Sequence, residues 1–112
     1  TDMIRFCKEA DVKMTYDICH AMLQCNLENI SLTQYTKQVM PYVAHMHISD
    51  AIGLNGEGIQ MFNGEIDFED VFNASSSYEF SWVTEIWSGH LHNGSGTYKA
   101  MREIETNFNK ML

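Results

Sequence analysis

The stretch "YVAHMHISD", residues 42–50, decides how this chain folds, because it has the pattern of a strand whose two faces differ. Successive side chains of a strand point to opposite faces, so Met46 lies on one face. Val43, His45 and His47 then lie on the other. A strand that is apolar on one face and turns polar near its carboxyl end is typical of parallel α/β folds, which bind ligands at that end.

Two further stretches have the same character, at residues 12–18 and 80–87. Helical spacing and capping residues predict helices around these strands, at residues 1–10, from 31 to about 40, in "FEDVFNA" after Asp67, and from Ser95 onward. Glycines mark residues 53–64 as a loop. The alternation of strands with helices predicts the α/β class, with three parallel strands adjacent in chain order and joined by right-handed crossovers.

A chain of 112 residues is short for a fold of this kind. A closed (β/α)8 barrel needs about 250 residues, and three parallel strands alone do not cover both faces of their sheet. We therefore expect residues 1–112 to form part of a larger fold, without an internal domain boundary. The remaining strands are expected to come from a longer chain or from another copy of this one.

The composition restricts the class of partner. Asp and Glu outnumber Lys and Arg by 15 to 7, and the resulting formal charge of -8 disfavours nucleic acid. No apolar run approaches the ~20 residues of a membrane span, so no membrane partner is expected. The three cysteines are odd in number and form no C-x-x-C pair, which disfavours a disulfide framework and favours a reducing, cytoplasmic location.

A polar side chain stands near the carboxyl end of each predicted strand: Asp17 in the first, His47 in the second and Glu85 in the third. Because neighbouring strands lie about 4.8 Å apart, these three groups are expected to converge on one point. Two carboxylates and one imidazole suit manganese, cobalt, magnesium or zinc. The pattern therefore predicts a divalent metal site.

Other interpretations of these residues exist. An Asp at a strand end often caps the following helix, and a single His is often just hydrogen-bonded. His45 is left out of the ligand set because it lies one layer deeper on the same face. A zinc site made of Cys19, His20 and Cys25 is an alternative, but their spacing does not match a zinc knuckle.

Four stretches, "YDICHAML", "HMHISDA", "NGEIDF" and "TEIWSGH", resemble the last three βα units of the xylose-isomerase-like TIM barrel superfamily. That superfamily includes sugar isomerases and epimerases, inosose dehydratase-like enzymes and endonuclease IV. The "GEGIQ" and "EIWSGH" stretches are most similar to the isomerase-like barrel that accompanies some sialic-acid-synthase-type proteins. The resemblance implies that this chain is the C-terminal part of a (β/α)8 TIM barrel.

The resemblance also implies roles for single residues. Asp17 and His47 would be metal ligands, and Glu85 would be both a ligand and the catalytic acid/base. His20 would be a catalytic residue that touches substrate or a second metal. His90, five residues after Glu85, is expected to contact substrate hydroxyls at the barrel mouth.

Two features depart from the family pattern. The family's other essential glutamate lies on the preceding strand, and residues 1–11 do not supply it, so the chain looks catalytically incomplete. Several epimerases of the family carry an arginine soon after the strand-end histidine, whereas no cation follows His47 before Lys99. A phosphorylated substrate is therefore disfavoured.

The candidate site residues and the resemblance lead to three hypotheses for the function. The leading hypothesis is a metal-dependent isomerase or epimerase that acts on a sugar or sugar derivative by proton transfer beside a carbonyl. The second is a non-catalytic sugar-binding or assembly barrel beside another carbohydrate enzyme. The third, DNA repair of the endonuclease IV kind, is disfavoured by the charge of -8.

Overall fold

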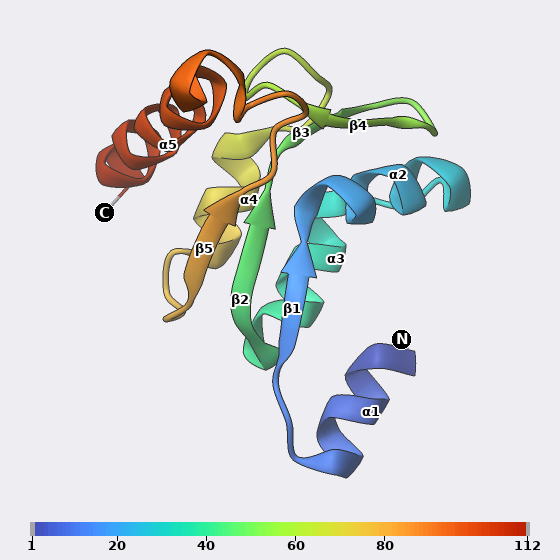
Figure 1. Cartoon of the computed structure of the whole chain (residues 1–112). Coiled ribbons are helices and arrows are strands. Elements are labelled where there is room, and N and C mark those ends of the chain that lie inside the picture. Colours follow the sequence, from blue (N-terminus) through green and yellow to red (C-terminus); the bar gives the residue numbers. More distant parts are fainter. Residues whose placement is uncertain (1, 112) are drawn as a thin grey trace.

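Three parallel strands form the central sheet of the computed structural model, which describes the backbone of residues 2–111 and the side chains of residues 2–108. They are β1 (Met14–Asp17), β2 (Val43–Ile48) and β5 (Ser81–Thr84), and they lie in the order β1-β2-β5 (Figure 1). The predicted α/β class and the parallel pairing of these strands in chain order are therefore confirmed.

Among residues 2–111, five α-helices accompany the sheet: α1 (Asp2–Ala10), α2 (Ile18–Glu28), α3 (Leu32–Val39), α4 (Phe68–Ser75) and α5 (Leu91–Met111). A short 3-10 helix, η1 (Met40–Tyr42), follows α3. Thr1, which the sequence analysis included in the first helix, lies outside the described residues.

The predicted capping residues act as expected. Ser31 begins α3 by accepting a hydrogen bond from the backbone N–H of Gln34 at 3.3 Å, and Asp67 begins α4 through the N–H of Asp70 at 3.1 Å. The start of α5 is interrupted, since His92, Asn93 and Gly94 have left-handed backbone angles. Regular helix follows, in agreement with the predicted start at Ser95.

Two elements were not predicted. Helix α2 follows β1 where no element was predicted, and an antiparallel hairpin has its first strand, β3 (Asp50–Ile52), between the predicted strand and the predicted loop and its second, β4 (Gly56–Ile59), within that loop. The residue that begins α2 is Asp17, whose carboxylate accepts the N–H of His20, so strand β1 ends one residue earlier than expected. The turn of the hairpin consists of residues 53–55, and Gly53 adopts the left-handed φ of +61° in it.

The helices cover one face of the sheet. In Figure 1, α3 and α4 lie behind the strands, and the hydrophobic core between them contains Tyr16 and Met46 from the sheet and Phe72 from α4. Met14, Trp82 and Ile86 pack against this core as partly buried residues, as their positions in the strands predicted. The opposite face carries Thr15 and Val83, both exposed.

The side-chain direction predicted for Val43 is wrong. Val43 was expected on the open face with His45, but it is buried in the core beside Met46. The cause is a register irregularity: Met14 pairs with Val43, whereas Thr15 pairs with His45, so Ala44 is an extra residue in β2. A bulge of this kind reverses the alternation of side chains on one side of it.

Within residues 2–111, the parallel sheet has β1 and β5 as its edges, and it does not close into a barrel. None of the helices in this part of the chain combines the length and the hydropathy needed to cross a bilayer. Cys7, Cys19 and Cys25 are all free and buried.

Candidate metal centre

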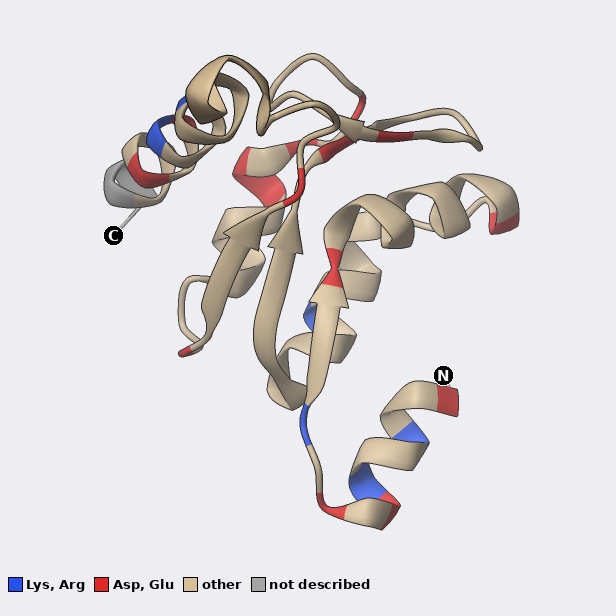
Figure 2. Ribbon diagram, viewed as in Figure 1, with Lys and Arg blue, Asp and Glu red and all other residues tan. Residues whose placement is uncertain are grey.

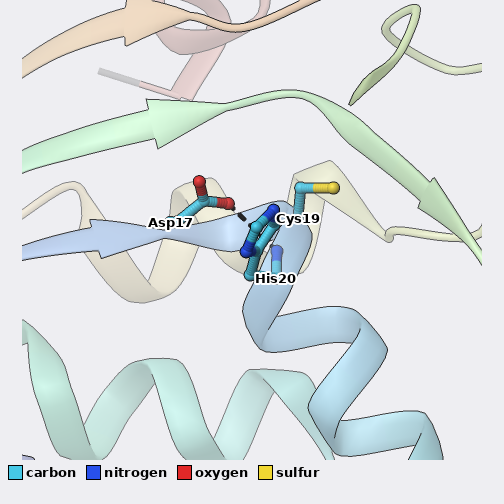
Figure 3. Close-up of side chains that lie close together, drawn as sticks. All are labelled: Asp17, Cys19 and His20. Carbon is cyan, nitrogen blue, oxygen red and sulfur yellow. Dashed lines mark hydrogen bonds between the residues drawn. The ribbon is translucent and has the colours of Figure 1, made fainter. Parts of the chain in front are cut away.

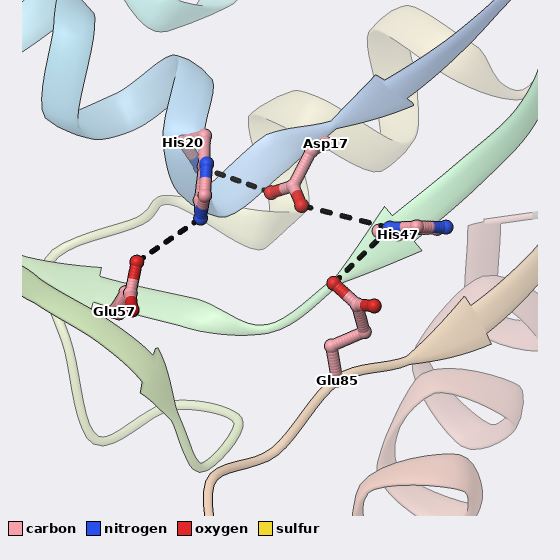
Figure 4. Close-up of polar contacts among 5 residues, drawn as sticks. All are labelled: Asp17, His20, His47, Glu57 and Glu85. Atoms are coloured by element: carbon pink, nitrogen blue, oxygen red, sulfur yellow. Dashed lines mark hydrogen bonds and ion pairs between the residues drawn. The ribbon is translucent and has the colours of Figure 1, made fainter.

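Asp17, His47 and Glu85 come together at the carboxyl ends of the three parallel strands (Figure 4). Asp17 and His47 are paired residues in the register of β1 and β2, and Glu85 follows the last residue of β5. His47 Nδ1 lies 3.1 Å from Glu85 Oε2 and 3.6 Å from Asp17 Oδ2. One donor atom from each of the three side chains lies within 4.8 Å of the other two.

The two oxygens of Asp17 face different groups. Oδ1 accepts the N–H of His20 at 3.0 Å and so caps α2, while Oδ2 faces His47. Asp17 therefore caps helix α2 with one oxygen and presents the other to the candidate metal centre. The capping bond fixes the orientation of the carboxylate that faces His47.

The three side chains remain open to ligands. Asp17 and His47 are partly buried, whereas the Glu85 side chain is 53% exposed. Two carboxylates and an imidazole form an oxygen-rich donor set that divalent cations such as manganese, magnesium, cobalt or zinc accept. The chemistry and convergence of these donors fit such a cation.

A cleft of about 320 Å³ adjoins this cluster. It is lined by Asp17, Cys19, His20, Ser49, Glu57, Gly58, Glu85, Ile86 and Trp87. His20 stands at its edge, where Nε2 lies 3.1 Å from Glu57 Oε2 on the β3–β4 hairpin (Figure 4). The cleft therefore has strand-end residues on one side and the hairpin on the other.

Asp50 holds the hairpin in this position. Its carboxylate is fully buried and accepts three backbone N–H groups: Ala51 at 2.8 Å and Ile66 at 3.0 Å on Oδ1, and Gly64 at 2.9 Å on Oδ2. These contacts link β3 to the segment that follows β4. The placement of Glu57 thus depends on a carboxylate that does not itself face the cleft.

Cys19 forms a second group with Asp17 and His20, because one donor atom of each lies within 4.8 Å of the others (Figure 3). Burial raises the pKa of its thiol, although the Gly58 backbone and the Ser49 hydroxyl oppose that rise. Cys25 lies farther along α2 in the hydrophobic core, where burial also raises its pKa. The structure does not bring Cys25 into this group, so it offers no support for a zinc site of Cys19, His20 and Cys25.

Two predicted positions have other surroundings. His45 Nδ1 lies 2.7 Å from Ser81 Oγ, and its ring meets the His47 ring edge to face. His45 therefore contacts His47, one member of the cluster, without contributing a donor atom to it. His90 is exposed in the turn after Glu85 and is not among the described residues that line the cleft, so its contact with substrate stays a prediction.

Sequence reasoning missed two residues of the cleft, Glu57 and Trp87. Glu57 lies on a hairpin strand in a segment that was predicted to be a loop, and Gly53 in the three-residue turn is the sequence signal that indicates a hairpin there. Trp87 was counted only as part of a strand, whereas β5 ends at Thr84 and Trp87 lies 70% exposed in the following turn.

No family model matches this chain, and no curated protein matches it either. The resemblance to xylose-isomerase-like barrels therefore stays a prediction.

Proposed function

We propose that this protein is a metal-dependent isomerase or epimerase that transfers a proton beside the carbonyl of a sugar or sugar derivative. The observation that carries the proposal is the position of His47 Nδ1 between the carboxylates of Asp17 and Glu85. Three adjacent parallel strands each contribute one donor at the same end, where parallel α/β folds bind their ligands. The cleft beside these donors has room for a small molecule.

We propose further that the three strands form an arc of a (β/α)8 barrel. Helices cover one face of the sheet, and the other face carries the exposed Thr15 and Val83. In a closed barrel, that second face would point to the axis, and the candidate metal centre would lie at the mouth. The strands needed for closure would be supplied by a longer chain or by another copy.

The proposed chemistry divides among the residues of the cleft. Asp17, His47 and Glu85 would hold a divalent cation, which would offset the negative charge that develops on the carbonyl oxygen. Glu85 is exposed toward the cleft, so its carboxylate can take a proton from the neighbouring carbon and return it. His20, at the cleft edge, would orient the substrate by hydrogen bonding to its hydroxyls.

Calorimetric titration with Mn²⁺ tests the proposal directly. The wild-type protein should bind the ion, and His47→Ala should weaken binding by about ten-fold or more because a ligand is lost. His92→Asn is the control, since His92 is an exposed histidine outside the cluster and Asn tolerates its left-handed backbone angles. It should leave Mn²⁺ affinity close to that of the wild type.

Proton transfer is measured separately, by deuterium incorporation from D2O beside the carbonyl of a panel of aldoses and ketoses. Excess Mn²⁺ should restore part of the exchange in His47→Ala, because mass action compensates for weaker binding. It should not restore exchange in Glu85→Gln, which lacks the basic carboxylate. A wild-type protein that binds no divalent cation, or a Glu85→Gln variant that exchanges at the wild-type rate, would refute this mechanism.

A further inference from the structure

We propose that the cleft selects an uncharged sugar over a phosphorylated or carboxylated one, and that Glu57 is the residue that makes this selection. This inference rests on the proposed function, because it names the substrate class of the same site. It is carried by the charges of the cleft lining, by the capped end of α2 and by the position of Trp87.

The lining is acidic. It contains the carboxylates of Asp17, Glu57 and Glu85, and among the described residues it contains no Lys or Arg. A divalent cation would offset the charges of Asp17 and Glu85 but not that of Glu57, which has only the His20 imidazole beside it in the described lining. Figure 2 shows Asp and Glu at the carboxyl end of the sheet and on the hairpin, whereas Lys and Arg lie on α1, α3 and α5 and just before β1.

The two groups that would otherwise attract an anion both face carboxylates. The amino end of a helix attracts phosphate, but at the start of α2 the Asp17 carboxylate accepts the N–H of His20 and places a negative charge there. The imidazole of His20 is the one basic side chain in the described lining, and its Nε2 faces Glu57 at 3.1 Å. An anionic substituent in the cleft would therefore meet carboxylates without a Lys or Arg side chain to compensate them.

Trp87 favours a ligand with an apolar ring face in the same cleft. Its backbone N–H donates to the Gly58 carbonyl at 2.9 Å, which ties the turn after β5 to the hairpin. Its indole lies over Gly58, where an added Cβ would overlap the ring, and the side chain remains 70% exposed. The C–H face of a sugar can stack on such a surface while its hydroxyls reach His20 and Glu57.

Fluorescence of Trp87 provides the test. The chain has two tryptophans, so a Trp82→Phe background leaves Trp87 as the only reporter. In this background D-fructose should quench or shift the emission, and D-fructose 6-phosphate should bind about ten-fold more weakly, on the scale of one charge interaction near a protein surface. Both sugars are titrated with and without Mg²⁺.

One variant and its matched control test whether Glu57 is responsible for the selection. Glu57→Gln keeps the size of the side chain and should improve the affinity for D-fructose 6-phosphate relative to D-fructose by about ten-fold. Glu79→Gln is the matched control, because Glu79 is exposed and precedes β5, at the opposite end of that strand from the cleft. It should leave the ratio of the two affinities unchanged.

The outcomes separate this inference from the proposed function. If D-fructose 6-phosphate binds wild-type protein as tightly as D-fructose, if neither sugar binds, or if Glu57→Gln leaves the ratio unchanged, the inference is wrong even when Mn²⁺ binds as expected. If D-fructose is selected but no divalent cation binds, the selection by Glu57 stands and the metal-dependent chemistry fails.

Discussion

Replacing Asp50 by Asn should destabilise the protein, although the two side chains have the same shape. The Asp50 carboxylate is fully buried, and its two oxygens accept three backbone N–H groups. An amide that keeps its oxygen at the Oδ1 position still accepts the N–H groups of Ala51 and Ile66. Its NH2 group then faces the N–H of Gly64, so two donors oppose each other where a bond of 2.9 Å existed.

The magnitude follows from these contacts. Hydrogen bonds to a charged acceptor contribute about 1.5–3 kcal/mol each, and leaving a buried donor unpaired costs about 1–3 kcal/mol. Asp50→Asn weakens two such bonds and replaces the third with a repulsive contact, so we expect a loss of about 2–4 kcal/mol in the free energy of unfolding. Asp50→Ala removes all three bonds and should cost more.

Urea denaturation followed by circular dichroism measures this loss, and amide hydrogen exchange locates it. The N–H of Gly64 should exchange faster in the variant because it loses its acceptor. The N–H of Ile66 should exchange faster to a smaller extent, because its acceptor is no longer charged. Asp67→Asn is the matched control, since Asp67 is an exposed helix cap and Asn caps helices equally well. A free energy of unfolding for Asp50→Asn within about 0.5 kcal/mol of the wild type would show that Asp50 does not hold the hairpin.

Two other predictions concern the core and the cleft. Burial raises the pKa of Tyr16 above its ordinary value of 10.0, so the folded state keeps the phenol protonated and the free energy of unfolding should fall as the pH rises above that value. In urea titrations at a series of pH values, Tyr16→Phe should reduce this alkaline decrease in the free energy of unfolding. At neutral pH the variant should lose about 1–3 kcal/mol, because the buried Thr36 hydroxyl loses its 2.8 Å partner. An unchanged pH dependence would contradict the assignment to Tyr16. Gly58→Ala should displace the Trp87 indole, since Gly58 has a φ of +64° and an added Cβ would overlap that ring. Trp87 emission and D-fructose affinity should both change, and a variant with wild-type emission and affinity would show that this contact does not position the indole.

Much of the fold follows from local patterns. The three parallel strands were predicted because their apolar and polar residues alternate with a period of two, and α3 and α4 because Ser31 and Asp67 accept the N–H groups that a helix leaves free at its start. Helix α2 was missed although Asp17 caps it. Asp17 is also the last residue of β1, and an extended pattern was continued through it.

The sequence alone was enough to place Asp17, His47 and Glu85 at one end of the sheet, because alternation and parallel pairing are regular and bring strand ends together. Tertiary structure decided which face Val43 occupies, since the extra residue Ala44 is visible only in the pairing of β1 with β2. It also decided that Glu57 faces His20 across the cleft. Contacts between distant segments depend on how the hairpin packs, and no local period encodes that packing.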